Sequence, residues 1–203
     1  MEGFNADVAH ELRTPLATLI NGTQVTLSSG RDADELRETL ESNLETLEDL
    51  KTLVNDMLFL ARADRGEQAA DQVPVSLAAE ARRVADYYEA ALEERGVVLR
   101  CEGDAIVAAN AGLVRRALAN LISNAIKATP RGGEIVLACQ PQPQGARVEV
   151  RNPGDPIPAA DLPRIFDRFF RSGQARAPRS EGHGLGLALS LIHISEPTRP
   201  LYI

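Results

Sequence analysis

The chain has 203 residues, of which 44% are hydrophobic and 25% are charged, a composition typical of soluble globular proteins. Its net charge of −7 argues against nucleic acid as the main partner, because binding a phosphate backbone requires a basic face. No signal peptide is recognisable, and no apolar run approaches the roughly 18 residues that a membrane-spanning helix needs. Aromatic residues make up only 4%, so the core must be built from aliphatic side chains.

Two long amphipathic helices are predicted over residues 4–29 and 34–64. Apolar residues recur in both at intervals of three and four, which places them on one face of each helix. A single hairpin cannot bury stripes of this length, so we expect two copies to form a homodimeric four-helix bundle. The alternative is that a second domain covers the stripe. Pro15 lies inside the first helix and is expected to kink it locally. The stripe of the second helix consists of Leu36, Leu40, Leu44, Leu47, Leu50, Val54 and Leu58.

The pattern changes after residue 66. Residues 67–76 are interpreted as a linker because the stretch is largely polar and ends close to Pro74. The remainder mixes helical and strand patterns, which predicts an α+β domain with helices on one face of a sheet. The predicted helices are 77–95 and 112–128, and the predicted strands are 97–101, 105–107, 134–139 and 146–150.

The first helix carries a histidine in a distinctive setting, because residues 10–16 read His-Glu-Leu-Arg-Thr-Pro-Leu. A neutral imidazole accepts a phosphoryl group, and the adjacent carboxylate of Glu11 can orient the ring or take its proton. Thr14 lies one turn along the same face as His10. A histidine on a helix is by itself more often an ordinary surface or core residue. This order of residues, however, resembles the H-box of sensor histidine kinases residue for residue.

A second motif lies near the end of the predicted helix 112–128. Asn120 and Asn124 are one turn apart and face the same way, and Lys127 follows three residues later. Amide oxygens are acceptable ligands for magnesium, and the lysine can neutralise phosphate charge. Two asparagines at this spacing can equally be a solvated pair on a helix surface. The run is similar to the N-box of the same family, which implies that one or both asparagines hold Mg²⁺.

The loop after the last predicted strand reads Arg-Asn-Pro-Gly-Asp-Pro-Ile-Pro. In the family this loop usually reads Asp-x-Gly-x-Gly, and its aspartate accepts a hydrogen bond from the adenine amino group. Aligning Ile157 and Pro158 on the family's usual Ile-Pro places Asn152 at the aspartate position, Gly154 at the first glycine and Pro156 at the second. An asparagine oxygen can still accept from the adenine amine. A similar Asn-Pro-Gly form occurs in the copper and heavy-metal sensor branch, so the departure is interpreted as a feature of that branch.

Two further motifs follow. Residues 162–171 concentrate aromatic residues and resemble the F-box, as an anchor for a lid or as a surface that docks on the helical hairpin; ordinary core packing is the alternative. Gly182, Gly184 and Gly186 let the backbone approach phosphates and resemble the G2-box. Residues 172–181 are then expected to form a mobile lid over ATP.

The five motifs occur in the family's order over residues 1–188. The resemblance implies a dimerisation and phosphotransfer domain over residues 1–66 and a Bergerat-type ATP-binding domain over residues 77–188. It implies ATP and Mg²⁺ as cofactors, phosphorylation of His10, and transfer to an aspartate on the receiver domain of a response regulator. The parent would be a bacterial inner-membrane protein with this portion in the cytoplasm. The alternatives are a catalytically inactive docking fragment and an ATPase of the chaperone or mismatch-repair kind, which the H-box disfavours.

Two features fall outside the family pattern. Residues 189–203 resemble a translated sequencing adapter more than the family's continuing helix and strands, so they are interpreted as a non-native tail on a truncated domain. Such a truncation would leave the last strand with an open edge. Cys101 and Cys139 lack metal-type spacing and are predicted to be free thiols, buried or half-buried.

Overall fold

A computed structural model describes residues 2–28, 30, 32–63, 72–172 and 184–189 of the chain. The chain divides into two compact units, Met1–Gly66 and Glu67–Ile203. Each is described by itself. Among the described residues, no helix combines the length and the apolar character needed to cross a membrane.

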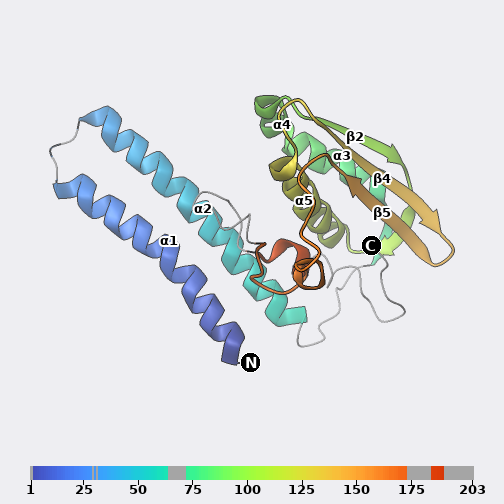
Figure 1. Cartoon of the computed structure of the whole chain (residues 1–203), viewed down its shortest axis with the longest axis horizontal. Coiled ribbons are helices and arrows are strands. Elements are labelled where there is room, and N and C mark those ends of the chain that lie inside the picture. The colour runs from blue at the N-terminus through green and yellow to red at the C-terminus, as the bar shows by residue number, and fades with distance from the viewer. Residues whose placement is uncertain (1, 29, 31, 64–71, 173–183, 190–203) are drawn as a thin grey trace. The chain divides into compact units, whose positions relative to one another are not determined.

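The first unit is a helical hairpin. Helix α1 (Glu2–Ser28) and helix α2 (Ala33–Ala63) run side by side in opposite directions (Figure 1). The carboxylate of Asp32 caps α2 by accepting hydrogen bonds from the backbone N–H groups of Asp34 at 3.1 Å and Glu35 at 2.9 Å. Both predicted helices are confirmed within a residue or two of their bounds, and α1 is helical on both sides of Pro15.

The second unit is built on a three-stranded sheet with the strand order β2-β4-β5. Strand β2 (Val98–Gly103) pairs parallel with β4 (Glu134–Gln142), which pairs antiparallel with β5 (Gly145–Arg151). Only Pro143 and Gln144 connect β4 to β5. Strand β1 (Val73–Ser76) and strand β3 (Ile106–Ala109) form a separate antiparallel pair. The predicted strands are therefore present, and β4 and β2 are longer than expected.

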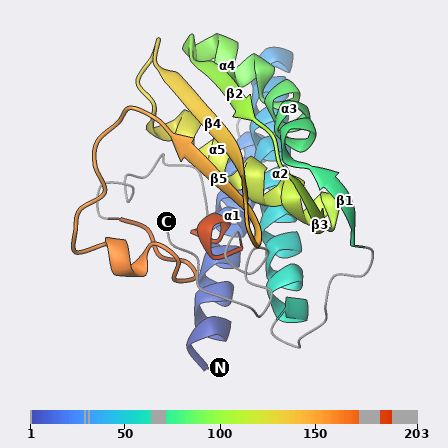
Figure 2. The same cartoon turned by 90° about the vertical axis from the view of Figure 1, so that its right-hand side faces the viewer.

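This unit also contains the α-helices α3 (Leu77–Tyr87), α4 (Glu89–Arg95) and α5 (Ala111–Ala128). A short 3-10 helix (Leu162–Arg164) follows β5. Helices α3 and α5 cover one face of the sheet (Figure 2). The core between helices and sheet is aliphatic, as the scarcity of aromatic residues predicts. Its buried members include Leu77, Ala81, Val84, Leu92, Val97, Leu118, Ile122, Ile126, Ile135 and Leu137. The α+β class is confirmed.

Two boundaries in this unit were predicted wrongly. Residues 73–76 were included in the linker, but they form β1 because Val75 is buried and the strand pairs with β3. Pro74 is compatible with this pairing because β1 has a neighbour on one side only. The predicted helix 77–95 is divided at Tyr88, which caps the end of α3 and precedes α4.

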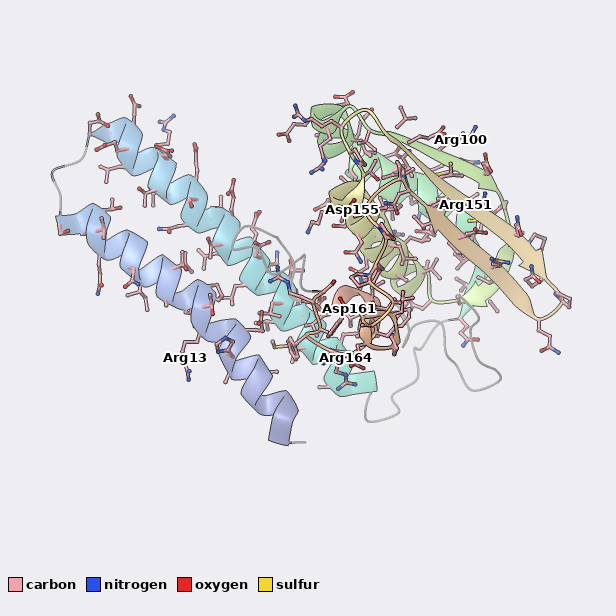
Figure 3. All side chains as sticks on the ribbon, viewed as in Figure 1. Arg13, Arg100, Arg151, Asp155, Asp161 and Arg164 are labelled. Atoms are coloured by element: carbon pink, nitrogen blue, oxygen red, sulfur yellow. The ribbon has the colours of Figure 1, made fainter. Side chains whose placement is uncertain are left out.

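The opposite face of the sheet carries ion pairs. Arg100 contacts Glu102 at 3.2 Å and Glu134 at 3.5 Å, while Arg151 contacts Glu149 at 2.7 Å. Figure 3 shows Arg100 and Arg151 on the sheet. The hydrogen bond from Arg151 lowers the pKa of Glu149. Exposed pairs of this kind add little to stability, but they suit a face that meets solvent.

The two cysteines lie on β2 and β4, and both are free thiols, as predicted. Cys139 is buried and Cys101 is half-buried. Burial raises the pKa of Cys101 and raises that of Cys139 to about 11. Both thiols therefore stay protonated, and poorly nucleophilic, at neutral pH.

A carboxylate between β2 and β3 organises the start of α3. Asp104 accepts hydrogen bonds from the Ser76 hydroxyl at 2.9 Å and from the backbone N–H groups of Ala78 at 2.9 Å and Ala105 at 2.8 Å. The Ser76 hydroxyl in turn caps α3 by accepting from Ala79 N–H at 3.1 Å. These donors hold the pKa of Asp104 below its ordinary value, the Ala78 N–H contributing most.

We therefore predict that Asp104→Asn lowers the melting temperature at pH 7 by a few degrees, through loss of the ionised acceptor. Because the folded-state pKa is depressed, the carboxylate stabilises the fold above its unfolded-state pKa. That contribution is lost as the pH falls through the folded-state pKa. Thermal melts at pH 7 and pH 3 check this, since the difference from the unmodified protein should shrink in acid. Asp86→Asn, at an exposed position on α3, is the control, and an equal effect there would contradict the prediction.

Candidate functional site

Helix α1 presents the predicted phospho-acceptor. His10 and Thr14 are exposed and Glu11 is half-buried. The Thr14 hydroxyl donates to the backbone carbonyl of His10 at 3.4 Å, so the threonine lies one turn from the histidine. Figure 3 shows the neighbouring Arg13 on the same helix. An exposed imidazole on a regular helix is open to a phosphoryl donor, and nothing on α1 has to rearrange to free it.

Helix α5 carries the asparagine motif on a face that is not part of the core. The helix starts at a cap in which the Asn110 side chain accepts from Leu113 N–H at 3.1 Å. Leu118 and Ile122 point into the core and fix the rotation of the helix, so Asn120 is left half-buried while Asn124 and Lys127 are exposed. Ala128 lies eight positions after Asn120, about 12 Å along the helix at the usual rise.

The end of this face that carries Asn120 contacts the glycine-rich segment, which is described over residues 184–189. The side-chain amide of Asn120 donates to the backbone carbonyl of Gly186 at 3.2 Å. A Cβ built on Gly186 would lie 3.5 Å from Cγ of Asn120, so the two residues are in van der Waals contact. Residues 186–189 are helical. Asn120 and Gly186 are 66 positions apart in the sequence, and the structure brings them together.

The C-terminal end of α5 meets the loop after β5. A Cβ on Gly154 would lie 2.6 Å from the carbonyl oxygen of Ala128, so only glycine permits this close approach to the end of α5. Asn152 is exposed, and its side-chain amide donates to the Pro153 carbonyl at 3.1 Å. Thr129 ends α5, and its hydroxyl donates back to the Ala125 carbonyl at 2.6 Å.

The aromatic segment, residues 162–171, contacts the glycine-rich segment through a hydrogen bond between backbone groups. Phe169 donates its N–H to the Gly184 carbonyl at 3.0 Å, and both residues have positive φ, 62° and 68°. Positive φ is uncommon for a phenylalanine, and no sequence signal predicts it here. The guanidinium of Arg164 lies 4.5 Å from the centre of the Phe170 ring, and Figure 3 shows Arg164 near Asp161. Phe166, Phe169 and Phe170 are half-buried.

Two interactions that sequence inspection missed hold α5 against α3 and against Tyr88, the residue between α3 and α4. The side chains of Tyr88 and Ser123 are hydrogen-bonded, and burial raises the pKa of Tyr88. Glu80 is buried and contacts Arg115 of α5 at 2.7 Å and Arg83 at 3.0 Å. A buried carboxylate with two guanidinium partners is well satisfied. The Tyr88–Ser123 bond has no sequence signature, although Ser123 shares the helical turn that joins Asn120 to Asn124.

The structure thus brings Asn120 to Gly186, and brings Gly154 to the end of α5 next to Lys127. It does not bring the two ends of this face into contact, since α5 itself separates them. Gly182 lies outside the described residues, as do residues 173–181 of the predicted lid and residues 190–203 of the predicted tail. The relation of His10 to α5 is not described, because the two belong to different units.

Comparison with known families gives two matches. Residues 1–66 match the family described as "His Kinase A (phospho-acceptor) domain". Residues 109–198 match "Histidine kinase-, DNA gyrase B-, and HSP90-like ATPase". The first match contains His10, and the second contains the asparagine motif, the Asn152 loop and the glycines.

Curated relatives cover almost the whole chain. "Sensor histidine kinase CusS" of Escherichia coli (strain K12) is 46% identical over 187 residues, which are 92% of this chain and 39% of the relative. "Sensor protein CzcS" of Cupriavidus metallidurans is 41% identical over 188 residues, 93% of this chain and 40% of the relative. The chain therefore spans about two fifths of the length of these proteins.

Solved structures resemble the fold. The Acinetobacter baumannii histidine kinase AdeS matches with a TM-score of 0.75 and 24% identity, over 91% of this chain and 85% of that one. The histidine kinase ThkA, in complex with the response regulator protein TrrA, matches with a TM-score of 0.66 and 25% identity, over 83% of this chain and 50% of that one.

Proposed function

Because the chain belongs to the sensor histidine kinases, we propose that it phosphorylates its own His10 from magnesium ATP and passes the phosphoryl group to an aspartate of a response regulator. The observation that carries this proposal is that one chain holds both a phospho-acceptor helix with an exposed His10 and a histidine kinase-type ATPase fold. We also propose that it acts on the cytoplasmic side of the bacterial inner membrane, where ATP is available.

The nucleotide is proposed to lie along α5. Asn152 would accept a hydrogen bond from the adenine amine through its amide oxygen, since its amide nitrogen already donates to Pro153. The glycines at 154, 182, 184 and 186 let the backbone come close to the nucleotide, and Lys127 would neutralise phosphate charge. The close contacts of Gly154 and Gly186 with α5 support this arrangement, because Gly186 contacts Asn120 and Gly154 contacts the end of the same helix.

The residues present suit magnesium, a hard ion that takes oxygen ligands and retains several waters. Asn120 and Asn124 would supply amide oxygens one turn apart, and their neutral charge leaves the phosphates as the main anionic ligands. When bound, the ion offsets the charge that develops on the phosphate oxygens. The chain's own contribution is to hold the donor in line with its acceptor.

In the proposed reaction, a ring nitrogen of neutral His10 attacks the γ-phosphorus. The new N–P bond forms as the bond to the leaving ADP oxygen breaks, and Glu11 takes or orients the imidazole proton. An aspartate of the receiver domain then accepts the phosphoryl group from the histidine. Thr14, one turn from His10, would orient water in the reverse, dephosphorylating reaction.

Incubation with γ-labelled magnesium ATP tests the proposal. We expect label that is labile in acid and stable in alkali, which distinguishes phosphohistidine from phosphoserine or phosphothreonine, and we expect it to move to an added receiver domain. Absence of label from a folded, dimeric protein would contradict the proposed kinase activity.

The homodimer rests on the exposed apolar stripe of α2. Leu40, Leu44, Leu47 and Leu58 have exposed fractions of 67%, 58%, 50% and 56%, which is unusual for several large apolar side chains on one helix. A second hairpin packed on this face would remove them from water, as in a four-helix bundle.

We therefore predict that Leu44→Glu raises the dissociation constant of the dimer at least tenfold and so favours the monomer. The reason is that a carboxylate would be buried at the interface. Sedimentation velocity over a concentration series measures this shift. Ser42→Glu places the same charge at an exposed position of α2 and should leave the dimer intact. A dimer that tolerates Leu44→Glu would rule out this face as the interface.

A further inference from the structure

The hydrogen bond between Asn120 and Gly186 fixes the orientation of the asparagine amide. The carbonyl of Gly186 can only accept, so the NH₂ group of Asn120 must face it. The amide oxygen takes no part in this bond, and it lies 3.6 Å from the position of a Cβ built on Gly186. The donor of the side chain is thus engaged by the glycine-rich segment, and the oxygen, beside the same segment, is the end that could serve another group.

The segment that Asn120 holds is attached at a second point. Gly184 accepts a hydrogen bond from Phe169 N–H at 3.0 Å, and two residues later Gly186 accepts from Asn120. The helical turn that follows is closed by Leu189 N–H, which donates to the Leu185 carbonyl at 2.9 Å. The backbone of 184–189 is therefore held on one side by the aromatic segment and on the other by α5.

Asn124 provides a matched comparison. It lies one turn after Asn120 on the same helix and is exposed, whereas Asn120 is half-buried. In the described part of the chain, Asn124 makes no hydrogen bond to residues 184–189. Two chemically identical side chains, both proposed to serve the same ion, therefore differ in burial and in the contact with Gly186.

We propose that Asn120 is a positioning residue that couples the nucleotide site to the glycine-rich segment. Its amide nitrogen holds Gly186 while its oxygen serves the magnesium nucleotide. A cation at the oxygen polarises the amide and strengthens its N–H donors, so binding at one end tightens the hold at the other. The proposal rests on the proposed function for this second step, but the hold on Gly186 exists without nucleotide.

Hydrogen exchange of residues 184–189 in the nucleotide-free protein tests the hold itself. In Asn120→Asp an oxygen replaces the donor and faces the Gly186 carbonyl, so two acceptors meet. We expect the Leu189 amide to exchange about five- to tenfold faster, the equivalent of one lost hydrogen bond. Asn124→Asp adds the same charge one turn away and should change exchange less than about twofold. Equal effects of the two variants, or no effect of Asn120→Asp, would overturn the proposal.

Two further measurements separate positioning from general destabilisation. Amides of β4 should keep their exchange rates in Asn120→Asp, and Asn120→Gln, which retains the donor, should restore part of the protection at Leu189. Magnesium ATP should then slow exchange at 184–189 in the unmodified protein but not in Asn120→Asp. If the unmodified protein bound no ATP, the proposed function would fail while the nucleotide-free comparison still decided the role of Asn120. Faster exchange throughout β4 would instead assign Asn120 a merely structural role.

Discussion

Replacing His10 by alanine is expected to reduce acid-labile phosphorylation to background while ATP binding and dimerisation stay unchanged. The alanine side chain has no lone pair to attack phosphorus, so phosphorylation at this position should be abolished and not merely slowed. His10 is exposed on a regular helix, and alanine is the better helix former, so the fold should not be weakened. Labelling with γ-labelled magnesium ATP, together with nucleotide titration of the same preparation, measures both quantities.

The matched control for this variant is Thr14→Ala, one turn away on the same exposed face. It removes the hydroxyl that donates to the His10 carbonyl but keeps the imidazole, so the protein should still be labelled. If Thr14 orients the attacking water, Thr14→Ala should lose its label about tenfold or more slowly than the unmodified protein. Label that persists in His10→Ala would instead point to another acceptor, and the chain contains two other histidines, His183 and His193.

The long helices were predictable because their stripes are periodic over many turns. Every turn of α2 repeats the same choice of an apolar residue on one face, so the pattern survives local irregularities. Strand β1 was not predictable in this way. It has four residues, one of them proline, and it forms only because β3, whose paired residues lie 30 to 36 positions later, runs beside it. The break at Tyr88 likewise depends on what the tyrosine contacts, since its hydrogen bond to Ser123 comes from another helix.

The candidate site likewise has some features that the sequence predicts and others that depend on the tertiary structure. The spacing of Asn120 and Asn124 is a local property of a helix, and it predicts a shared direction. Which group each asparagine contacts is decided by the tertiary structure, so nothing in the sequence distinguishes the role of Asn120 from that of Asn124. The same holds for the glycines. A glycine in a motif signals that the backbone passes close to something, but only the structure identifies Ala128 as the neighbour of Gly154 and Phe169 as the neighbour of Gly184.

These contacts suggest why the motifs are spread over the second half of the chain. Helix α5 is fixed on the sheet by its core face, and both the Asn152 loop and the 184–189 segment are placed by contact with it. A rigid helix therefore sets the separation of the elements proposed to bind the two ends of a nucleotide. Catalysis by positioning requires such a reference, because an error of about 1 Å in placing the reacting groups costs rate.

Gly184→Ala is expected to weaken ATP binding by at least tenfold. Gly184 has a φ of 68°, and a Cβ built there would lie 2.8 Å from the carbonyl carbon of Phe169 and from the carbonyl oxygen of Phe170. A distance this short to backbone atoms cannot be relieved by rotating a side chain. The segment 184–189 must move away from the aromatic segment, and with it the backbone proposed to approach the phosphates. Calorimetric titration with a non-hydrolysable ATP analogue measures the loss.

Gly132→Ala separates this clash from the backbone conformation. Gly132 has a similar φ of 77°, but a Cβ built there meets nothing within 4 Å. Both variants carry the left-handed strain of about 1–2 kcal/mol, which should appear in the unfolding free energy of each. Only Gly184→Ala adds the clash, so only this variant should lose nucleotide affinity. If both variants bound the analogue equally well, the junction of Phe169 with Gly184 would be a packing feature of the fold, and the phosphates would have to be held elsewhere.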